Sequence, residues 1–72
     1  MELTGLQITA IRNSHSEHMF ASPVSAVDEG PFYRIAGTYI LDKCRIRKVE
    51  RADDKVTVRM KDGDVVLTVM EK

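Results

Sequence analysis

The sequence KVTVRMKDGDVVLTVM at residues 55–70 predicts a β-hairpin and thereby the class of fold. Asp62-Gly63 suits a two-residue type I′ turn, because both residues tolerate the positive φ angles that this turn needs. The turn would pair Met60 with Val65, and opposed residues share one face of a hairpin. That face collects only apolar side chains: Val56, Val58, Met60, Val65, Leu67 and Val69. A face of this kind predicts a sheet packed on a core.

Residues 43–51 predict a further strand beside this hairpin. A four-residue loop at residues 52–55 would place Val49 opposite Val58. A helix over residues 42–51 is the alternative, but its apolar residues form no continuous stripe, which favours the strand.

The predicted strand needs a bulge, because Ile46 and Val49 are three residues apart and break strict alternation. An extra residue at Arg47-Lys48 would bring Ile46 opposite Met60. We therefore expect a bulged strand rather than a regular one.

Two more segments have the apolar content of strands. Residues 32–41 are apolar on both faces, and Gly37 is the position where a strand there would bend. Residues 4–12 place most of their apolar side chains on one face, with Ile11 on the other. Both segments therefore predict strands that contact more than one apolar neighbour.

Residues 13–31 show no strand pattern and are expected to be irregular. Ser22-Pro23 is typical of a helix start, which predicts one or two helical turns at residues 23–28. The whole pattern predicts one all-β domain over residues 1–72, with four or five antiparallel strands curled into a small barrel or half-barrel. SH3-like and Sm-like barrels have this size, but the sequence carries no motif of either family.

The composition narrows the class of protein. The chain has 72 residues, 43% of them hydrophobic, and eleven basic residues balance eleven acidic ones. These values exclude a disordered polyelectrolyte, and no apolar run approaches the roughly 18 residues of a membrane span. The single cysteine makes no internal disulfide and no signal peptide is recognisable, so we expect a cytoplasmic protein.

The charges are distributed unevenly along the chain. Residues 1–31 carry one basic and four acidic residues, residues 32–51 six basic and two acidic, and residues 52–72 four basic and five acidic. Guanidinium groups match phosphate geometry, so the basic centre predicts a site for a nucleotide or nucleic acid. The candidate ligand-binding residues are Arg34, Arg45, Arg47, Lys48 and Arg59, with Tyr39 to stack on a base. The alternative is that these cations only solvate the sheet and block edge pairing.

No cofactor, metal or catalytic group is expected. His15, His18 and Cys44 resemble a metal site weakly, because structural zinc normally has four ligands in two close pairs. The two histidines are expected on an exposed loop and Cys44 as a small buried hydrophobe. No nucleophile motif is present, so we expect a protein that is not an enzyme.

Two classes of function remain open. The first is a small oligomeric protein that binds an anionic ligand on its basic sheet face. The second is a protein-interaction module, such as an inhibitor or adaptor subunit, which would use residues 13–31 and the edge of the C-terminal strand. Self-association is expected because residues 65–70 are apolar on both faces and need a partner if they are exposed.

Overall fold

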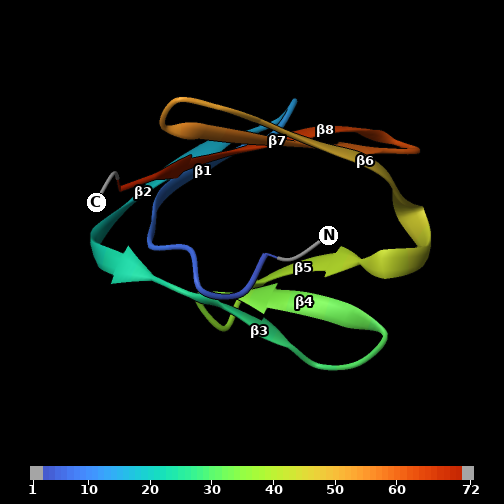
Figure 1. The fold of residues 1–72 in the computed structure, drawn as a ribbon, viewed down its shortest axis with the longest axis horizontal. Helices are drawn as coiled ribbons and strands as arrows, with labels where there is room; N and C mark the ends of the chain where they lie inside the picture. The colour runs from blue at the N-terminus through green and yellow to red at the C-terminus, as the bar shows by residue number, and fades with distance from the viewer. Residues whose placement is uncertain (1–2, 71–72) are drawn as a thin grey trace.

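The computed structural model describes residues 3–70, which form two antiparallel sheets packed as layers (Figure 1). The larger sheet has the order β2-β1-β8-β7-β6, and the smaller has the order β3-β4-β5. The strands are β1 (Ile8–Arg12), β2 (Glu17–Val24), β3 (Ala26–Asp28), β4 (Phe32–Ile35), β5 (Tyr39–Asp42), β6 (Ile46–Ala52), β7 (Lys55–Met60) and β8 (Gly63–Val69). The all-β prediction is confirmed, although residues 3–70 form eight strands rather than four or five, and these pair within two separate sheets and close no barrel.

The chain passes between the two sheets on opposite sides of the molecule (Figure 1). Ser25 separates β2 of the larger sheet from β3 of the smaller one, and a 3₁₀ turn at Lys43–Arg45 joins β5 to β6. The helical turn predicted at residues 23–28 is wrong, because β2 ends and β3 runs there. These two crossings hold the sheets face to face.

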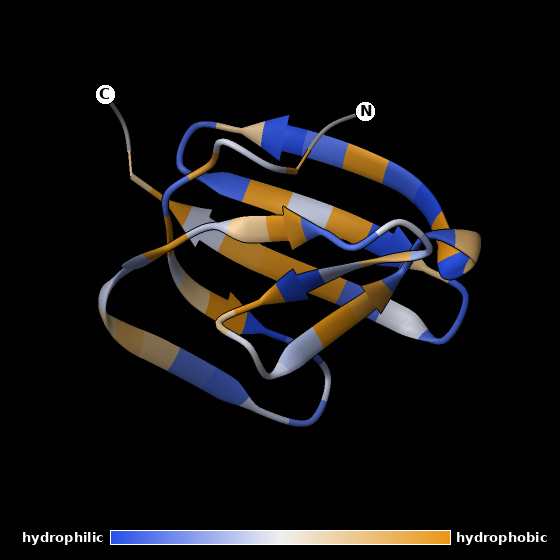
Figure 2. Cartoon of the chain, turned by 90° about the horizontal axis from the view of Figure 1, so that it is seen from below, coloured by the Kyte–Doolittle hydropathy of each residue, from blue (hydrophilic) through white to orange (hydrophobic). Residues whose placement is uncertain are grey.

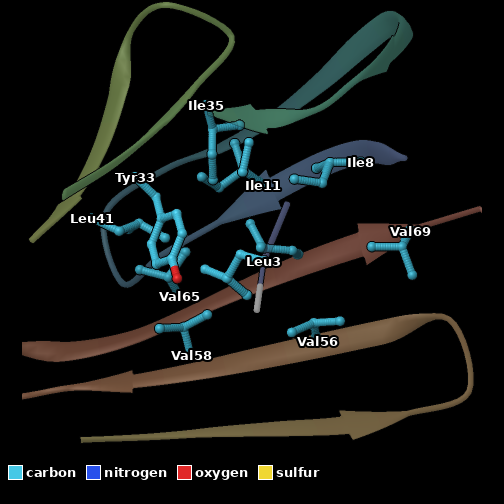
Figure 3. Close-up of a cluster of buried hydrophobic side chains, with 12 residues drawn as sticks. Leu3, Ile8, Ile11, Tyr33, Ile35, Leu41, Val56, Val58, Val65 and Val69 are labelled. Atoms are coloured by element: carbon cyan, nitrogen blue, oxygen red, sulfur yellow. The ribbon is translucent and has the colours of Figure 1, made fainter. Parts of the chain in front are cut away.

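The core lies between the two sheets and is built from their inner faces. Figure 3 shows side chains from both sheets, such as Tyr33 and Val65, meeting there. The largest fully buried side chains are Leu3, Ile8, Ile35, Val56, Val58 and Leu67. No charged side chain is buried among residues 3–70, so apolar burial, at about 25 cal/mol per Å², dominates the stability of the fold.

The β7–β8 hairpin forms, but its register lies two residues from the predicted one. Met60 pairs with Gly63, so Lys61 and Asp62 make the turn. A type I′ turn is absent because Gly63, with a φ of 133°, begins β8 and neither turn residue has a positive φ. A shift of two residues keeps each side chain on its predicted face. Figure 2 shows apolar and polar residues following one another in bands along the strands.

The bulged strand predicted upstream of this hairpin is confirmed as β6. Val49 lies opposite Val58 and Ile46 lies opposite Met60, with one extra residue at Arg47. The bulge turns Ile46 and Val49 toward the same face of the sheet, against the core, which is the reason the sequence cannot alternate strictly here.

The 3₁₀ turn replaces the first residues of the predicted strand, and the alternative helix over residues 42–51 is also wrong. Cys44 lies in this turn and is exposed, so its prediction as a buried hydrophobe is wrong. Arg45 also lies in the turn and therefore does not share a strand face with Arg47, as the regular strand would have required.

The single strand predicted over residues 32–41 is wrong, because this segment is the hairpin of β4 and β5. Ala36 and Gly37 have φ values of 57° and 70°, and two positive φ angles in succession reverse the chain. The Thr38 N–H donates to the Ile35 carbonyl at 3.1 Å and closes the turn. The predicted bend at Gly37 is thus a complete reversal.

A bulge in β1 explains how Ile11 reaches the core. The register of β1 shifts between Ile8 and Ala10, which adds a residue to the strand. Ile8 and Ile11 therefore both face inward, opposite Val69 and Leu67, and both are buried.

Residues 13–31 are largely extended rather than irregular. β2 forms the outer edge of the larger sheet beside β1, and most of its side chains are exposed. Its backbone pairs without burying a face, so its side chains show no alternation that sequence analysis could detect. Pro23 fits this edge position, where a missing backbone N–H can face solvent.

The C-terminal strand β8 is central in the larger sheet, where β1 and β7 pair with it on either side. Its backbone is therefore paired on both sides within the chain, and the exposed edge expected for it does not exist, although Met70 just after it is 48% exposed. A second copy of the chain is therefore not needed to pair with this strand. No helix within residues 3–70 has the length and apolar character to cross a membrane.

Candidate functional site

Three of the predicted ligand-binding cations surround one hollow on the larger sheet. We call it the cationic hollow, and its lining residues are Arg47, Lys48, Arg59, Met60 and Asp64. Its volume is about 430 Å³ and it is open to solvent. Arg59 and Asp64 lie on the outer face of the sheet, away from the core, because their neighbours Val58 and Val65 are buried.

The strand register brings these side chains together. Lys48 lies opposite Arg59, and Arg59 lies opposite Asp64, so three adjacent strands each contribute one charge to a single row. The bulge in β6 adds Arg47 next to this row. The same irregularity that lets β6 reach the core thus places two cations side by side on its edge.

Arg59 is the centre of an ion-pair network at the hollow. Its Nη1 donates to Asp64 Oδ2 at 3.0 Å and its Nη2 to Glu50 Oε1 at 3.2 Å. Lys48 Nζ lies 3.4 Å from Glu50 Oε2. Hydrogen bonds from Arg59 and then Lys48 hold the pKa of Glu50 below its ordinary value, and Glu50 in turn raises the pKa of Arg59. The network therefore holds the Arg59 guanidinium in one orientation.

Arg47 differs from the other two cations of the hollow. Within residues 3–70 its side chain forms no ion pair and no hydrogen bond, whereas Lys48 pairs with Glu50 and Arg59 pairs with both Glu50 and Asp64. The cluster consequently has one positive charge in excess, and that charge is on a group suited to bidentate binding of an oxyanion.

The remaining predicted residues lie elsewhere, so the six do not form one surface. Arg34 lies on β4 of the smaller sheet, where Nε donates to Glu29 Oε2 at 3.2 Å and the guanidinium lies 5.4 Å from the Phe32 ring centre. Tyr39 packs near His18 and Phe20, with ring centres 6.3 Å away from each. Tyr39 therefore joins β5 to the edge strand β2 and does not face the cationic hollow.

Arg45 serves the connection between the sheets. Its Nη1 donates to Asp62 Oδ2 at 3.2 Å, its Nε lies 3.8 Å from Asp42 Oδ2, and its carbonyl accepts from the Lys61 N–H at 3.0 Å. Asp42 ends β5 and Asp62 belongs to the β7–β8 turn, so Arg45 links the two sheets.

Arg45 also borders a second cavity, of about 200 Å³, which sequence analysis missed. It opens where the ends of the two sheets meet. Its residues come from four separate segments: Asn13–His15, Ile40–Asp42 with Arg45, Met60 and Asp62–Val65. No local pattern marks such a cavity, because only the packing of the sheets brings these segments together.

The histidines and Cys44 do not converge. His15 borders the second cavity, His18 packs on Phe20 with ring centres 5.0 Å apart, and Cys44 is in the 3₁₀ turn. In the described part of the chain, no three His, Cys, Asp or Glu side chains are grouped so that they could hold a metal ion.

Comparison with known proteins identifies no relative. No family model matches the chain, and no curated protein or solved structure matches it significantly. The chemistry of the cationic hollow is therefore inferred from its residues.

Proposed function

We propose that this protein binds a phosphate-bearing anion at the cationic hollow, as a binding protein rather than an enzyme. The observation that carries the proposal is the guanidinium of Arg47, unpaired within residues 3–70, beside Lys48 and Arg59 around an open hollow. Cations, a thioether and a paired carboxylate line the hollow, and this set suits recognition of charge rather than nucleophilic attack.

Arg47 would make the first contact, because no carboxylate within residues 3–70 is paired with its guanidinium. Arg59 is already oriented by Glu50 and Asp64, so it can donate to a phosphate oxygen by exchanging one of these carboxylates. Charge-assisted hydrogen bonds of this kind are strong, but exposed ones are screened by salt. We expect binding that is moderate at low ionic strength and weakens steeply as salt is added.

The experiment is a calorimetric titration of inorganic tripolyphosphate into the protein and four variants. Arg47→Gln and Arg59→Gln are each expected to weaken binding about tenfold or more, because each removes hydrogen bonds to a charged group. Glu50→Gln is expected to tighten binding, since it removes the carboxylate that competes for Arg59 and Lys48.

Arg51→Gln is the matched control. Arg51 is an exposed arginine on the same strand without an ion pair in residues 3–70, but it lies opposite the core residue Val56, away from the hollow. Tripolyphosphate binding should be unchanged by this substitution. The proposal would be contradicted if Arg47→Gln and Arg51→Gln lost the same amount of affinity for tripolyphosphate, or if Arg47→Gln bound it as tightly as the wild type.

A second candidate function is a protein-interaction module that uses β2 rather than the C-terminal strand. Met19, on this edge strand, is 76% exposed and is the most exposed large hydrophobic residue among residues 3–70. Partner binding through an apolar edge responds weakly to salt, unlike phosphate binding. If the partner is a second copy, light scattering at micromolar concentration should show a dimer that Met19→Ser abolishes, and a monomer would exclude self-association.

A further inference from the structure

The aromatic side chains lie away from the cationic hollow, and this separation bears on the chemistry of its ligand. Sequence-tolerant binding of single-stranded nucleic acid combines a cationic surface with aromatic rings on which bases stack. The chain has four aromatic residues, all in the described part: Phe20, Phe32, Tyr33 and Tyr39. None of them lines the hollow.

Sheet order shows how far the rings are from the hollow. Phe20 is on β2 and Arg47 is on β6, at the opposite edges of the five-stranded sheet. Four strand spacings separate these edges, roughly 19 Å at about 4.8 Å each. A base stacked on Phe20 would therefore belong to a different part of a ligand than a phosphate held by Arg47.

The other three rings belong to the smaller sheet and have contacts of their own. Tyr33 is only 4% exposed, with Lys43 Nζ 4.9 Å from its ring centre. Phe32 has Arg34 over its ring, and Tyr39 packs against the His18–Phe20 pair. These rings lie in the layer opposite the cationic hollow and cannot serve it as a stacking platform.

Carboxylates also limit the extent of an anion in the hollow. Asp64 lies next to Arg59 in the row that Lys48 and Arg59 form across the strands. Glu50 lies in the next row of the outer face, opposite Thr57. A long polyanion that continued across the sheet would meet both negative charges. A compact anion that ends within the hollow avoids this repulsion.

We infer that the cationic hollow recognises the phosphate groups of a compact anion, such as a short chain of linked phosphates, without contacting a base. This inference rests on the proposed anion site and adds its ligand class. The absence of a ring at the hollow predicts that a nucleoside attached to the phosphates contributes nothing to affinity.

The test compares the dissociation constants of inorganic tripolyphosphate, ATP and single-stranded oligothymidylates of increasing length. Tripolyphosphate and ATP should agree within about threefold, because a stacked base would strengthen binding about fivefold or more. Phe20→Leu and Tyr39→Leu should leave the binding of all three probes unchanged, whereas Arg47→Gln should weaken tripolyphosphate and ATP equally.

The outcomes separate this inference from the proposed function. If ATP binds more than about fivefold tighter than tripolyphosphate, or either aromatic variant weakens oligothymidylate binding, the base is recognised and the inference is wrong while the anion site stands. The inference is also wrong if ATP binds more tightly than tripolyphosphate to the wild type but not to Arg47→Gln. Guanidinium planes also stack on bases, so this result would mean that Arg47 contacts the base. If no probe binds, or Arg47→Gln binds them all like the wild type, both proposals fail.

Discussion

The two faces of the five-stranded sheet are stabilised by different interactions. The inner face carries Val56, Val58, Val65, Leu67 and Val69, all buried and all apolar. The outer face carries Lys48, Arg59, Asp64 and Glu50, all exposed or half-exposed and linked by ion pairs. Because the two sets alternate along the same strands, each residue serves one face only.

This difference separates stability from recognition. Burial of an apolar side chain is worth about 1.5–3 kcal/mol, whereas an exposed ion pair is worth little because water and salt compete for both charges. The inner face therefore maintains the fold, and the outer charges can change partners without unfolding it. A cation on the outer face can exchange its carboxylate partners for the phosphate oxygens of a ligand, as proposed for Arg59.

The largest expected effect is on the inner face. Leu67→Ala should destabilise the protein by about 2–5 kcal/mol, because Leu67 is fully buried and its truncation leaves a cavity. A chain of this length has a total stability of roughly 4–11 kcal/mol at the usual value per residue. Urea unfolding followed by circular dichroism measures this loss.

The adjacent residue Val66 gives the matched control, because it points to the outer face of the same strand and is only half-buried. Val66→Ala should cost about 1 kcal/mol or less, mainly through β-propensity. Similar losses for Leu67→Ala and Val66→Ala would show that the two faces do not differ in the way described.

An intermediate effect is expected at the turn that sets the register of both faces. Gly63→Ala should destabilise the protein by about 1 kcal/mol or more, because Gly63 has a φ of 133°. A methyl group there would lie 3.9 Å from Ser14 Oγ, an ordinary contact, so the cost is conformational rather than steric. Thermal unfolding measures this loss of stability.

Lys61→Ala is the control for the turn, since Lys61 is exposed and has no ion pair within residues 3–70. Lys61→Ala should change the free energy of unfolding by no more than about 0.5 kcal/mol. A Gly63→Ala protein as stable as Lys61→Ala would mean that the positive φ is not required.

The smallest expected effect is on how the free energy of unfolding depends on pH, through Glu50 on the outer face. The pKa of Glu50 in the folded protein is lower than its ordinary value of 4.5, so its ionised form stabilises the fold above that pH. This contribution is lost as the pH falls through the folded pKa. Glu50→Gln should therefore be slightly less stable than the wild type near pH 7, and this difference should shrink as the pH falls below 4.5, as measured by urea midpoints. A difference that persists in acid would not come from the carboxylate.

Local patterns predicted the centre of this fold well. The alternation in residues 55–70 identified the inner set of β7 and β8, and the spacing of Ile46 and Val49 identified the bulge in β6. The turn of that hairpin lies one residue earlier than predicted, which shifts the pairing register by two residues. Alternation has a period of two and therefore tolerates such a register shift.

The edges of the sheets were predicted poorly. β2 buries few of its side chains, so nothing in residues 17–24 alternates, and only the free edge of β1 makes this segment a strand. The candidate site was predicted in part: Arg47, Lys48 and Arg59 converge, but Arg34, Arg45 and Tyr39 lie in other parts of the fold. Their separation depends on the hairpin reversal at Ala36-Gly37 and on the 3₁₀ turn.

The sequence by itself determined an all-β chain, the apolar face of β7 and β8, and a basic central segment. Only the tertiary structure decided that β8 is a central strand, that β2 is an edge, and that the basic residues are divided between two layers. The physical reason is that burial of a face appears in side-chain alternation, whereas strand order depends on backbone pairing. Backbone N–H and C=O groups are the same in almost every residue, so the sequence carries little information about which strands meet.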